Sequence, residues 1–215
     1  INKLIYSEVD AITTLNDVMG KFLRERLEYS ATTLYGVIDL DKFRPMDKKD
    51  AWKAEQQNVP RIVTEKIVIL YAGIMSPFQD PLCIIELAEK LKNDYPNVIF
   101  VFVGTGPLKR ELKKKIRERS LNNVILLDVM SHEMMPFVYN IADLALILPP
   151  SLSVRGMYEY FKLALPRKFI EYSGCGKPIL CITPPCVASK LCLEWKTGYH
   201  VSPKNIEKAV DIINT

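Results

Sequence analysis

The residues best suited to chemistry lie in one short segment, residues 165–178, which reads LPRKFIEYSGCGKP. If a helix begins at Pro166, the spacing of three and four residues places Arg167 and Lys168 on the same face as Glu171. Two cations beside the positive end of a helix favour an anion such as a diphosphate. A carboxylate one turn further along can accept hydrogen bonds from both hydroxyls of a ribose. The alternative is a surface salt bridge from Glu171 back to Arg167 or Lys168, which would contribute little to stability.

A second candidate is the glycine-containing turn VGTGP at residues 103–107, which follows an apolar run and precedes a helical pattern. Gly104 and Gly106 would let the backbone approach a ligand, and the start of the next helix favours anions. A dinucleotide-binding fingerprint would need a third glycine where Lys109 stands, and it belongs on the first strand of its unit. The turn is therefore open to two interpretations, a ligand-binding loop or an ordinary tight turn.

The elements that would position these residues alternate along the chain from about residue 66. Apolar runs typical of strands lie at residues 67–71, 98–103, 124–127, 144–148 and 179–182. Helices are predicted at residues 81–92, 107–119, 131–141, 166–174 and 205–213. Strands that alternate with helices predict an α/β fold, a Rossmann-like doubly wound parallel sheet covered on both faces. Ligands bind outside the carboxyl ends of such strands, which directs attention to the loops at residues 72–80, 104–106, 128–131 and 149–165.

Residues 1–60 follow a different pattern from the rest of the chain. Strand-like runs at residues 10–15 and 32–37 flank a helical pattern at 18–29, and residues 47–59 read as a polar linker or surface helix. These residues include few apolar side chains for a core of their own. We therefore interpret residues 1–60 as a hinge or linker segment and remnant of an N-terminal domain that is missing from the sequence. Residues 61–215 form the main domain in this interpretation.

Composition is that of an ordinary globular protein, with 48% hydrophobic and 25% charged residues among 215. Apolar runs nowhere approach the ~20 residues that span a bilayer. The five cysteines lack the C-x-x-C spacing of a metal or redox site, so we expect reduced core residues in a cytoplasmic protein. His132 and His200 have no neighbours suited to a metal site, and both are predicted to be structural.

Positive charge is concentrated in one helical segment, residues 109–119, within a chain whose formal net charge is +4. One interpretation is a solvated helix face. The other is peripheral contact with an anionic membrane surface, such as the inner face of the cell membrane. Nucleic-acid binding is not expected, because no aromatic side chains alternate with these charges.

Residues 165–178 closely resemble the signature helix of the family-four glycosyltransferases, of the glycosyl transferases group 1 type, with the pattern P-x-K-x-x-E-Y-x-x-x-G-K-P. Further segments resemble that family in the same order along the chain, namely residues 10–15, 35–45, 70–73, 103–107 and 139–143. The resemblance implies the C-terminal, nucleotide-sugar-binding half of a two-domain GT-B fold. It also implies a retaining, metal-independent transfer of a sugar from a UDP- or GDP-linked donor to a hydroxyl, with no cofactor beyond the donor.

Residue roles follow from the matching positions. Glu171 resembles the family's ribose-binding glutamate, and Lys168, with Arg167 beside it, resembles the basic position that faces the diphosphate. These three residues are the candidate catalytic group, since two cations and helix-start amides would stabilise the departing diphosphate. The other predicted nucleotide contacts are Gly73, Gly104, Gly106, Val129 and Met130.

One departure from the family pattern bears on activity. The first glutamate of the E-x7-E pair would fall at Leu163, and Glu159 has the wrong spacing to replace it. Divergence within the family is one explanation, and a non-catalytic nucleotide-binding module with a decayed site is another. A nucleotide-sugar epimerase shares the two-domain architecture and is a third possibility. In GT-B enzymes the acceptor site lies in the N-terminal domain, so the isolated chain is expected to bind nucleotide without transferring a sugar. The base, the sugar, the acceptor and the oligomeric state are left open.

Overall fold

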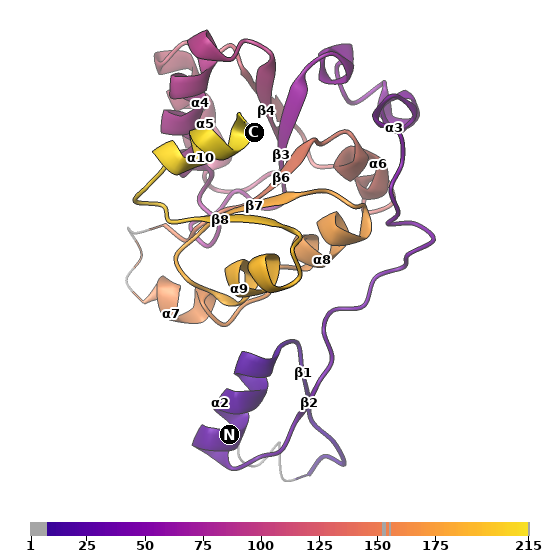
Figure 1. The fold of residues 1–215 in the computed structure, drawn as a ribbon, viewed down its shortest axis with the longest axis vertical. Helices are drawn as coiled ribbons and strands as arrows, with labels where there is room; N and C mark the ends of the chain where they lie inside the picture. The colour runs from indigo at the N-terminus through magenta and orange to yellow at the C-terminus, as the bar shows by residue number, and fades with distance from the viewer. Residues whose placement is uncertain (1–7, 152–153, 155, 215) are drawn as a thin grey trace.

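The computed structural model describes residues 8–151, 154 and 156–214, which form a main body and a small N-terminal unit (Figure 1). Six parallel strands form the sheet of the main body in the order β5-β4-β3-β6-β7-β8. Their bounds are β3 (Ile67–Ala72), β4 (Val98–Val103), β5 (Val124–Leu127), β6 (Leu144–Ile147), β7 (Ile179–Ile182) and β8 (Gly198–Val201). The chain builds outward from β3 to β5, then returns beside β3 and builds outward the other way. This order confirms the predicted doubly wound fold and places the topological switch point between β3 and β6.

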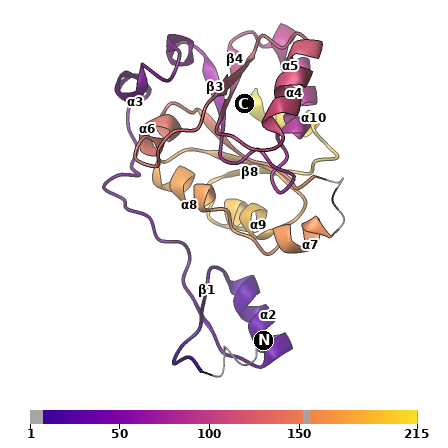
Figure 2. The same ribbon diagram turned by 180° about the vertical axis from the view of Figure 1, so that it is seen from behind.

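Helices cover both faces of this sheet (Figures 1 and 2). One face carries the 3-10 turn η2 (Pro81–Cys83), α4 (Ile84–Asp94), α5 (Lys109–Glu118) and α10 (Glu207–Ile213). The other face carries α3 (Lys48–Glu55), the 3-10 turn η1 (Arg61–Thr64), α6 (Met135–Asn140), α7 (Met157–Phe161), α8 (Arg167–Gly174) and α9 (Val187–Glu194). Because both faces are covered, the central strands are apolar on both sides. Leu70 and Val101 point into one core, while Tyr71 and Phe102 point into the other.

Several element boundaries differ from the prediction. The helix expected at residues 107–119 begins at Lys109, and the one expected at 131–141 begins only at Met135. Residues 131–134 instead form a turn, in which the amide of Met134 donates to the carbonyl of Ser131 at 3.1 Å, so Ser131 does not cap the helix. Asp80 caps its helix as predicted by accepting from the amide of Leu82, although the first turn is 3-10.

Cysteine placement follows the composition. The four buried thiols are Cys175, Cys181, Cys186 and Cys192, while Cys83 is half-buried and all five are free. The prediction that most of them are core residues is therefore confirmed. Part of the loop at residues 149–165 that was singled out from the sequence, residues 152, 153 and 155, lies outside the described residues.

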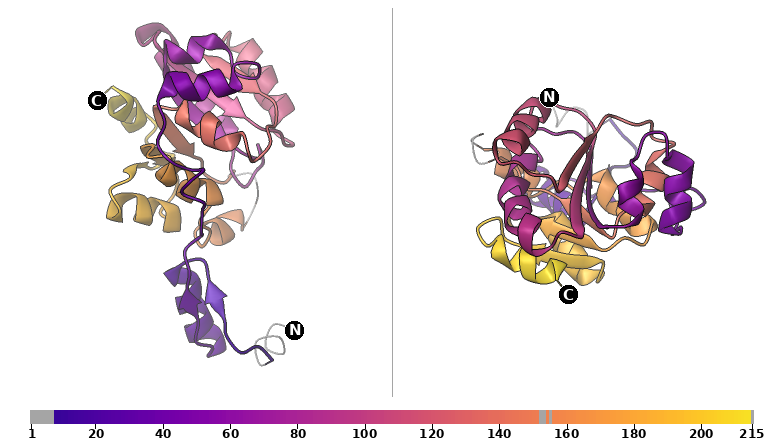
Figure 3. Two further views of the ribbon diagram at one scale, coloured as in Figure 1. Left: turned by 90° about the vertical axis from the view of Figure 1, so that its right-hand side faces the viewer. Right: turned by 90° about the horizontal axis from the view of Figure 1, so that it is seen from above.

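The N-terminal unit consists of two short parallel strands, β1 (Thr13–Thr14) and β2 (Thr32–Thr33), joined by α2 (Asp17–Leu27). Both strands are much shorter than the runs expected from the sequence. Figure 3 shows the unit standing away from the main body, connected to it by an extended stretch of chain. The Asn16 side-chain amide bridges the gap by donating to the carbonyl of Leu163 at 2.9 Å.

The extended stretch, residues 35–45, crosses directly over α8. A methyl group added to Gly174 of that helix would lie 2.3 Å from Cδ1 of Ile38 and 3.0 Å from the carbonyl oxygen of Phe43. Phe43 is only 2% exposed, and Ala51 of α3 is fully buried against the same core. The packed body therefore extends back to Phe43. The assignment of residues 1–60 to a hinge segment stays a prediction.

Candidate functional site

Helix α8 begins one residue later than predicted. Pro166 has φ −62° and ψ 133°, which makes it the N-cap, and the first helical residue is Arg167. The amides of the first turn have no partner within the helix, so this end carries the positive end of the helix dipole. Arg167 and Lys168 lie in this first turn, and Glu171 lies one turn further along, as the sequence indicated.

The Glu171 side chain is only 4% exposed, and its carboxylate accepts hydrogen bonds from three donors. Arg167 Nε lies 2.9 Å from Oε1, and His132 Nε2 lies 3.1 Å from the same oxygen. The Tyr139 hydroxyl donates to Oε2 at 2.8 Å. The salt bridge between Glu171 and Arg167 that the sequence left open is therefore present. It is not a surface pair, however, because the carboxylate is buried and two other elements also donate to it.

Lys168 points inward from the same turn. Its Nζ is buried and, among the described residues, has no hydrogen-bond partner. The ammonium lies 3.8 Å from the centre of the Tyr71 ring. Burial lowers the pKa of Lys168 to about 7, and the Glu171 carboxylate only partly opposes this. A buried ammonium without a hydrogen-bond partner is costly, and an anion beside it would offset that cost.

Three glycines with positive φ lie in the loops after β3 and β4, and the first of these, Gly73, lies against Lys168. A Cβ on Gly73 would lie 2.7 Å from Lys168 Nζ. A Cβ on Gly104 would lie 2.2 Å from the carbonyl oxygen of Gly73, and one on Gly106 would lie 2.3 Å from that of Met75. Close approach of the loops after β3 and β4 therefore requires glycine at 104 and 106, as in the tight-turn interpretation.

A cavity of about 190 Å³ lies at the carboxyl ends of β3, β4 and β5, and we call it the carboxyl-edge cavity. Its lining is Ala72, Gly73, Ile74, Val103, Gly104, Thr105, Val129, Met130, Met135 and Tyr139. Tyr139 connects the cavity to Glu171 through the hydrogen bond described above. Lys168 adjoins the cavity below Gly73.

The structure thus brings together most of the residues singled out from the sequence. Gly73, Gly104, Val129 and Met130 line the carboxyl-edge cavity. Lys168 adjoins the cavity at Gly73, and Glu171 contacts its lining through Tyr139. Gly106 does not line it. Arg167 has a side chain 69% exposed and does not line this cavity; it borders a different one of about 270 Å³, together with Leu15, Gly36, Val37, Ile38, Leu165 and Ile170. The functional roles of all these residues stay predictions.

Sequence analysis missed three contributors to the site. His132 was interpreted as structural, yet its ring reaches Glu171 from the loop between β5 and α6. Tyr139 was noted only as part of a family-like motif. Lys109 was counted among surface charges, but its Nζ donates to the carbonyls of Gly104 and Leu127 at 2.7 and 2.9 Å. Lys109 therefore ties the turn after β4 to the end of β5. Glu171 lies 39 positions from His132 and 32 from Tyr139, so no local spacing in the sequence indicates that these side chains meet.

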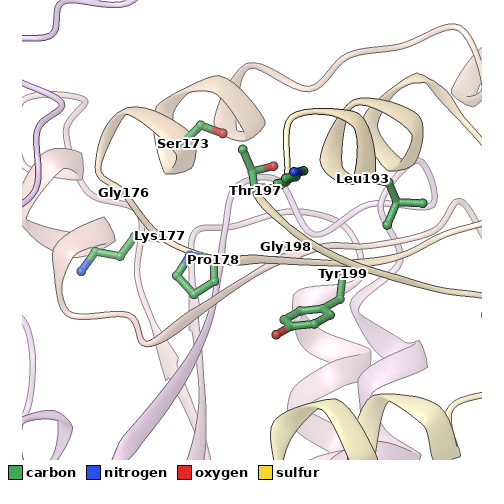
Figure 4. Close-up of a pocket in the computed structure, with 9 residues that line it drawn as sticks. Ser173, Gly176, Lys177, Pro178, Leu193, Thr197, Gly198 and Tyr199 are labelled. Carbon is green, nitrogen blue, oxygen red and sulfur yellow. The ribbon is translucent and has the colours of Figure 1, made fainter. Parts of the chain in front are cut away.

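Another hollow, of about 520 Å³, lies at the opposite edge of the sheet (Figure 4). Its lining is Ser173, Gly176, Lys177, Pro178, Leu193, Lys196, Thr197, Gly198 and Tyr199. The strands β7 and β8 begin here and the helices α8 and α9 end here. Helix C-termini carry partial negative charge, and the lysines offset it; Lys177 Nζ, for example, donates to the carbonyl of Asn140 at 3.0 Å.

Within the described ranges, no cluster of three or more His, Cys, Asp or Glu side chains could hold a metal ion. Metal independence stays a prediction.

The described part of the chain also contains no helix with the length and apolar character needed to cross a bilayer.

Comparison with known proteins gives concordant results. A family model described as glycosyl transferases group 1 matches residues 53–215. The chain is 22% identical over 190 residues to chitobiosyldiphosphodolichol beta-mannosyltransferase of Debaryomyces hansenii, an alignment that covers 81% of this chain and 38% of that protein. The solved structure of Anabaena HepE in complex with UDP-glucose superposes with a TM-score of 0.73 at 19% identity, over 98% of this chain and 55% of that one. The C-terminal domain of a glycosyl transferase group 1 family protein from Francisella tularensis, LpcC, superposes with a TM-score of 0.62 at 18% identity, over 83% and 86%.

Proposed function

Because this chain belongs to the glycosyl transferases group 1 family, we propose that its carboxyl-edge cavity binds the nucleotide of a nucleotide-diphosphate sugar. One observation carries the proposal. A buried carboxylate, Glu171, and a buried ammonium without a hydrogen-bond partner among the described residues, Lys168, lie together at the start of one helix beside this cavity. An acid that accepts from ribose hydroxyls and a cation that meets phosphates are the two polar groups such a ligand needs.

In this proposal the ribose contacts Glu171, and the diphosphate contacts Lys168, Arg167 and the first amides of α8. The base lies along the loop that presents Val129 and Met130, which line the far side of the cavity. When the sugar leaves, negative charge develops on the diphosphate, and these positive groups stabilise it. The UDP-glucose held by the similar HepE structure supports a uridine-linked donor. Retention of configuration and independence from metal rest on the family resemblance.

We also propose that the sugar acceptor is bound by a domain outside these 215 residues. The chain spans 38% of the mannosyltransferase and 55% of the HepE chain, and it aligns over most of the separate C-terminal domain of LpcC. The chain alone would then bind nucleotide without turnover. A radiolabelled donor incubated with the chain and candidate hydroxyl acceptors tests this, and any transferred label would contradict it.

A decayed, non-catalytic nucleotide-binding module is the rival reading, because Leu163 stands where the family has a glutamate. Titration of the chain with UDP and with GDP separates a working nucleotide site from a decayed one. Saturable binding of either nucleotide supports the proposal, and its absence for both supports decay.

Replacing Glu171 by glutamine is expected to weaken the preferred nucleoside diphosphate by about 1–3 kcal/mol, because an amide accepts fewer and weaker hydrogen bonds from ribose than a carboxylate does. Isothermal titration calorimetry measures the change. Glu159→Gln is the matched control, since Glu159 carries the same group at 64% exposure away from the cavity and should leave affinity unchanged. An unaltered affinity in Glu171→Gln would remove this residue from the site.

Affinity for the nucleoside diphosphate is expected to fall as pH rises above about 7, approaching tenfold per pH unit. Below that pH, Lys168 is already protonated in the free chain, because its pKa is about 7. Above it, binding requires proton uptake, because the diphosphate favours the ammonium. Calorimetry at pH 6.5 and 8.5 measures the slope. The Lys168→Arg variant stays charged across this pH range. Its affinity should therefore change with pH only through ionisation of the ligand, and the additional pH dependence seen with Lys168 should disappear. Equal slopes in the two proteins would contradict the assignment.

Membrane contact stays a prediction. In the structure, the basic side chains that would make this contact lie on one exposed face of α5. On α5, Arg110, Lys113, Lys114 and Arg117 follow the i, i+3, i+4, i+7 spacing of one helix face and are all exposed. Lys114 pairs with Glu118. We propose an anionic lipid surface as the partner of this face; a vesicle-sedimentation assay with phosphatidylserine tests it.

A further inference from the structure

We propose that His132 is a positioning residue, which orients the Glu171 carboxylate for the ribose and so gives the site its preference for ribonucleotides. The inference rests on the nucleotide-binding function proposed above. It begins from the fact that His132 approaches Glu171 from a different element than either of the other two donors. Arg167 belongs to the same helix as Glu171, Tyr139 belongs to α6, and His132 belongs to the loop between β5 and α6.

The hydrogen-bonding capacity of the carboxylate decides which donors remain when a ligand binds. An ionised carboxylate accepts at about four sites, and three are already used by Arg167, His132 and Tyr139. A ribose diol brings two further donors, so one of the three must leave. Arg167 is free to do so, because its side chain is 69% exposed and a diphosphate nearby would attract it.

His132 is held where it is by a second contact. Its ring lies 5.4 Å from the ring of Phe43, tilted by 54°, and Phe43 is itself 2% exposed in the core. Tyr139 is likewise buried, with its ring 4.8 Å from that of Tyr172. His132 and Tyr139 therefore hold one oxygen each while Arg167 departs. Since an ionised carboxylate only accepts, Nε2 of His132 must carry the proton in this arrangement.

The position of His132 along the chain adds a second consequence. It lies in the loop that presents Val129 and Met130 to the carboxyl-edge cavity. The bond from His132 to Glu171 therefore fixes the distance between the base-contacting loop and the ribose-contacting acid. A purely structural role is a poor explanation for this side chain, because it is 58% exposed and adds little to the core.

Two substitutions at this position separate the roles. Glutamine places its amide nitrogen close to the position of Nε2 and can still donate to Glu171, whereas asparagine is shorter and cannot. The 215-residue chain and the variants His132→Gln and His132→Asn are titrated with UDP and GDP, and then with the 2′-deoxy form of whichever binds more tightly. Thermal unfolding of each variant checks that the fold is intact.

We expect His132→Asn to reduce the ratio of ribo to 2′-deoxyribo affinity by about tenfold, and His132→Gln to keep most of it. A ratio unchanged in His132→Asn, or equal losses for both sugars, would overturn the positioning role while leaving the proposed function in place. If neither UDP nor GDP binds saturably to the unaltered chain, the proposed function fails first, and the inference fails with it.

Discussion

Replacing Lys168 by methionine is expected to stabilise the unliganded chain while reducing its affinity for the nucleoside diphosphate by about ten- to a hundredfold. These opposite signs share one cause. The ammonium is buried without a hydrogen-bond partner among the described residues, so the folded chain bears its desolvation cost until an anion arrives. Methionine fills a similar volume without the charge, and removal of a buried charge in this way stabilises by about 1–3 kcal/mol, or roughly 3–10 °C in a chain of this size.

The stability gain from Lys168→Met should also depend on pH. Because the folded chain lowers the pKa of Lys168 to about 7 from its usual 10.5, the unfolded chain binds the extra proton between those values. The penalty is therefore complete below pH 7 and disappears as pH approaches 10.5. Differential scanning calorimetry at pH 6.5 and 9.5, with calorimetric titration of nucleotide at pH 6.5, measures both effects. A variant that loses stability at pH 6.5, or keeps its nucleotide affinity, would show that Lys168 has another role.

Replacing Gly104 by alanine is expected to cost about 3–5 kcal/mol of unfolding free energy, which lowers the melting temperature by roughly 6–20 °C. Two effects combine at this position. The backbone has φ +137°, which side chains rarely adopt, and the new Cβ would lie 2.2 Å from the carbonyl oxygen of Gly73. The loops after β3 and β4 would have to separate, and the cavity between them would lose its shape.

Gly156→Ala provides the control for this prediction. Gly156 also has positive φ, +79°, but a Cβ there would meet no atom of the described residues within 4 Å. Its substitution should cost only the backbone strain, about 1–2 kcal/mol. Chemical denaturation of both variants measures the difference. If Gly104→Ala proves no more costly than Gly156→Ala, contact between the two loops is not what requires glycine at 104.

The strands β3 to β7 and the edge at which the site lies could be predicted from the sequence because they depend on local patterns. The apolar run at residues 98–103 is buried on both faces, and a parallel sheet binds ligands at its carboxyl edge. Helix α9 was not predicted, because Val187, Ala188 and Leu191 are buried together with Ser189 and Cys192, which obscures any alternation of polar and apolar faces. Helix α3 was left as a linker or surface helix, since its charged sequence conceals a single core residue, Ala51.

The site itself was predictable only where its members are neighbours in the sequence. The spacing of Arg167, Lys168 and Glu171 is set by one helix, and so it was visible. The burial of Lys168 and the exposure of Arg167 could not be predicted in this way. Lys168 is buried because it lies against Gly73, and that contact depends on the position of the loop after β3. His132 reaches Glu171 because the turn at residues 131–134 and the ring of Phe43 hold it in place. Both contacts depend on tertiary packing.

The extended stretch that joins the two units follows the helix bearing Glu171, from Gly36 beside Ile170 to Phe43 and Pro45 beside Gly174 and Gly176. The stretch is therefore packed against α8 along most of the length of that helix. The eight-residue helix that carries Arg167 and Lys168 in its first turn thus also contacts, near its C-terminal end, the chain that leads to the N-terminal unit.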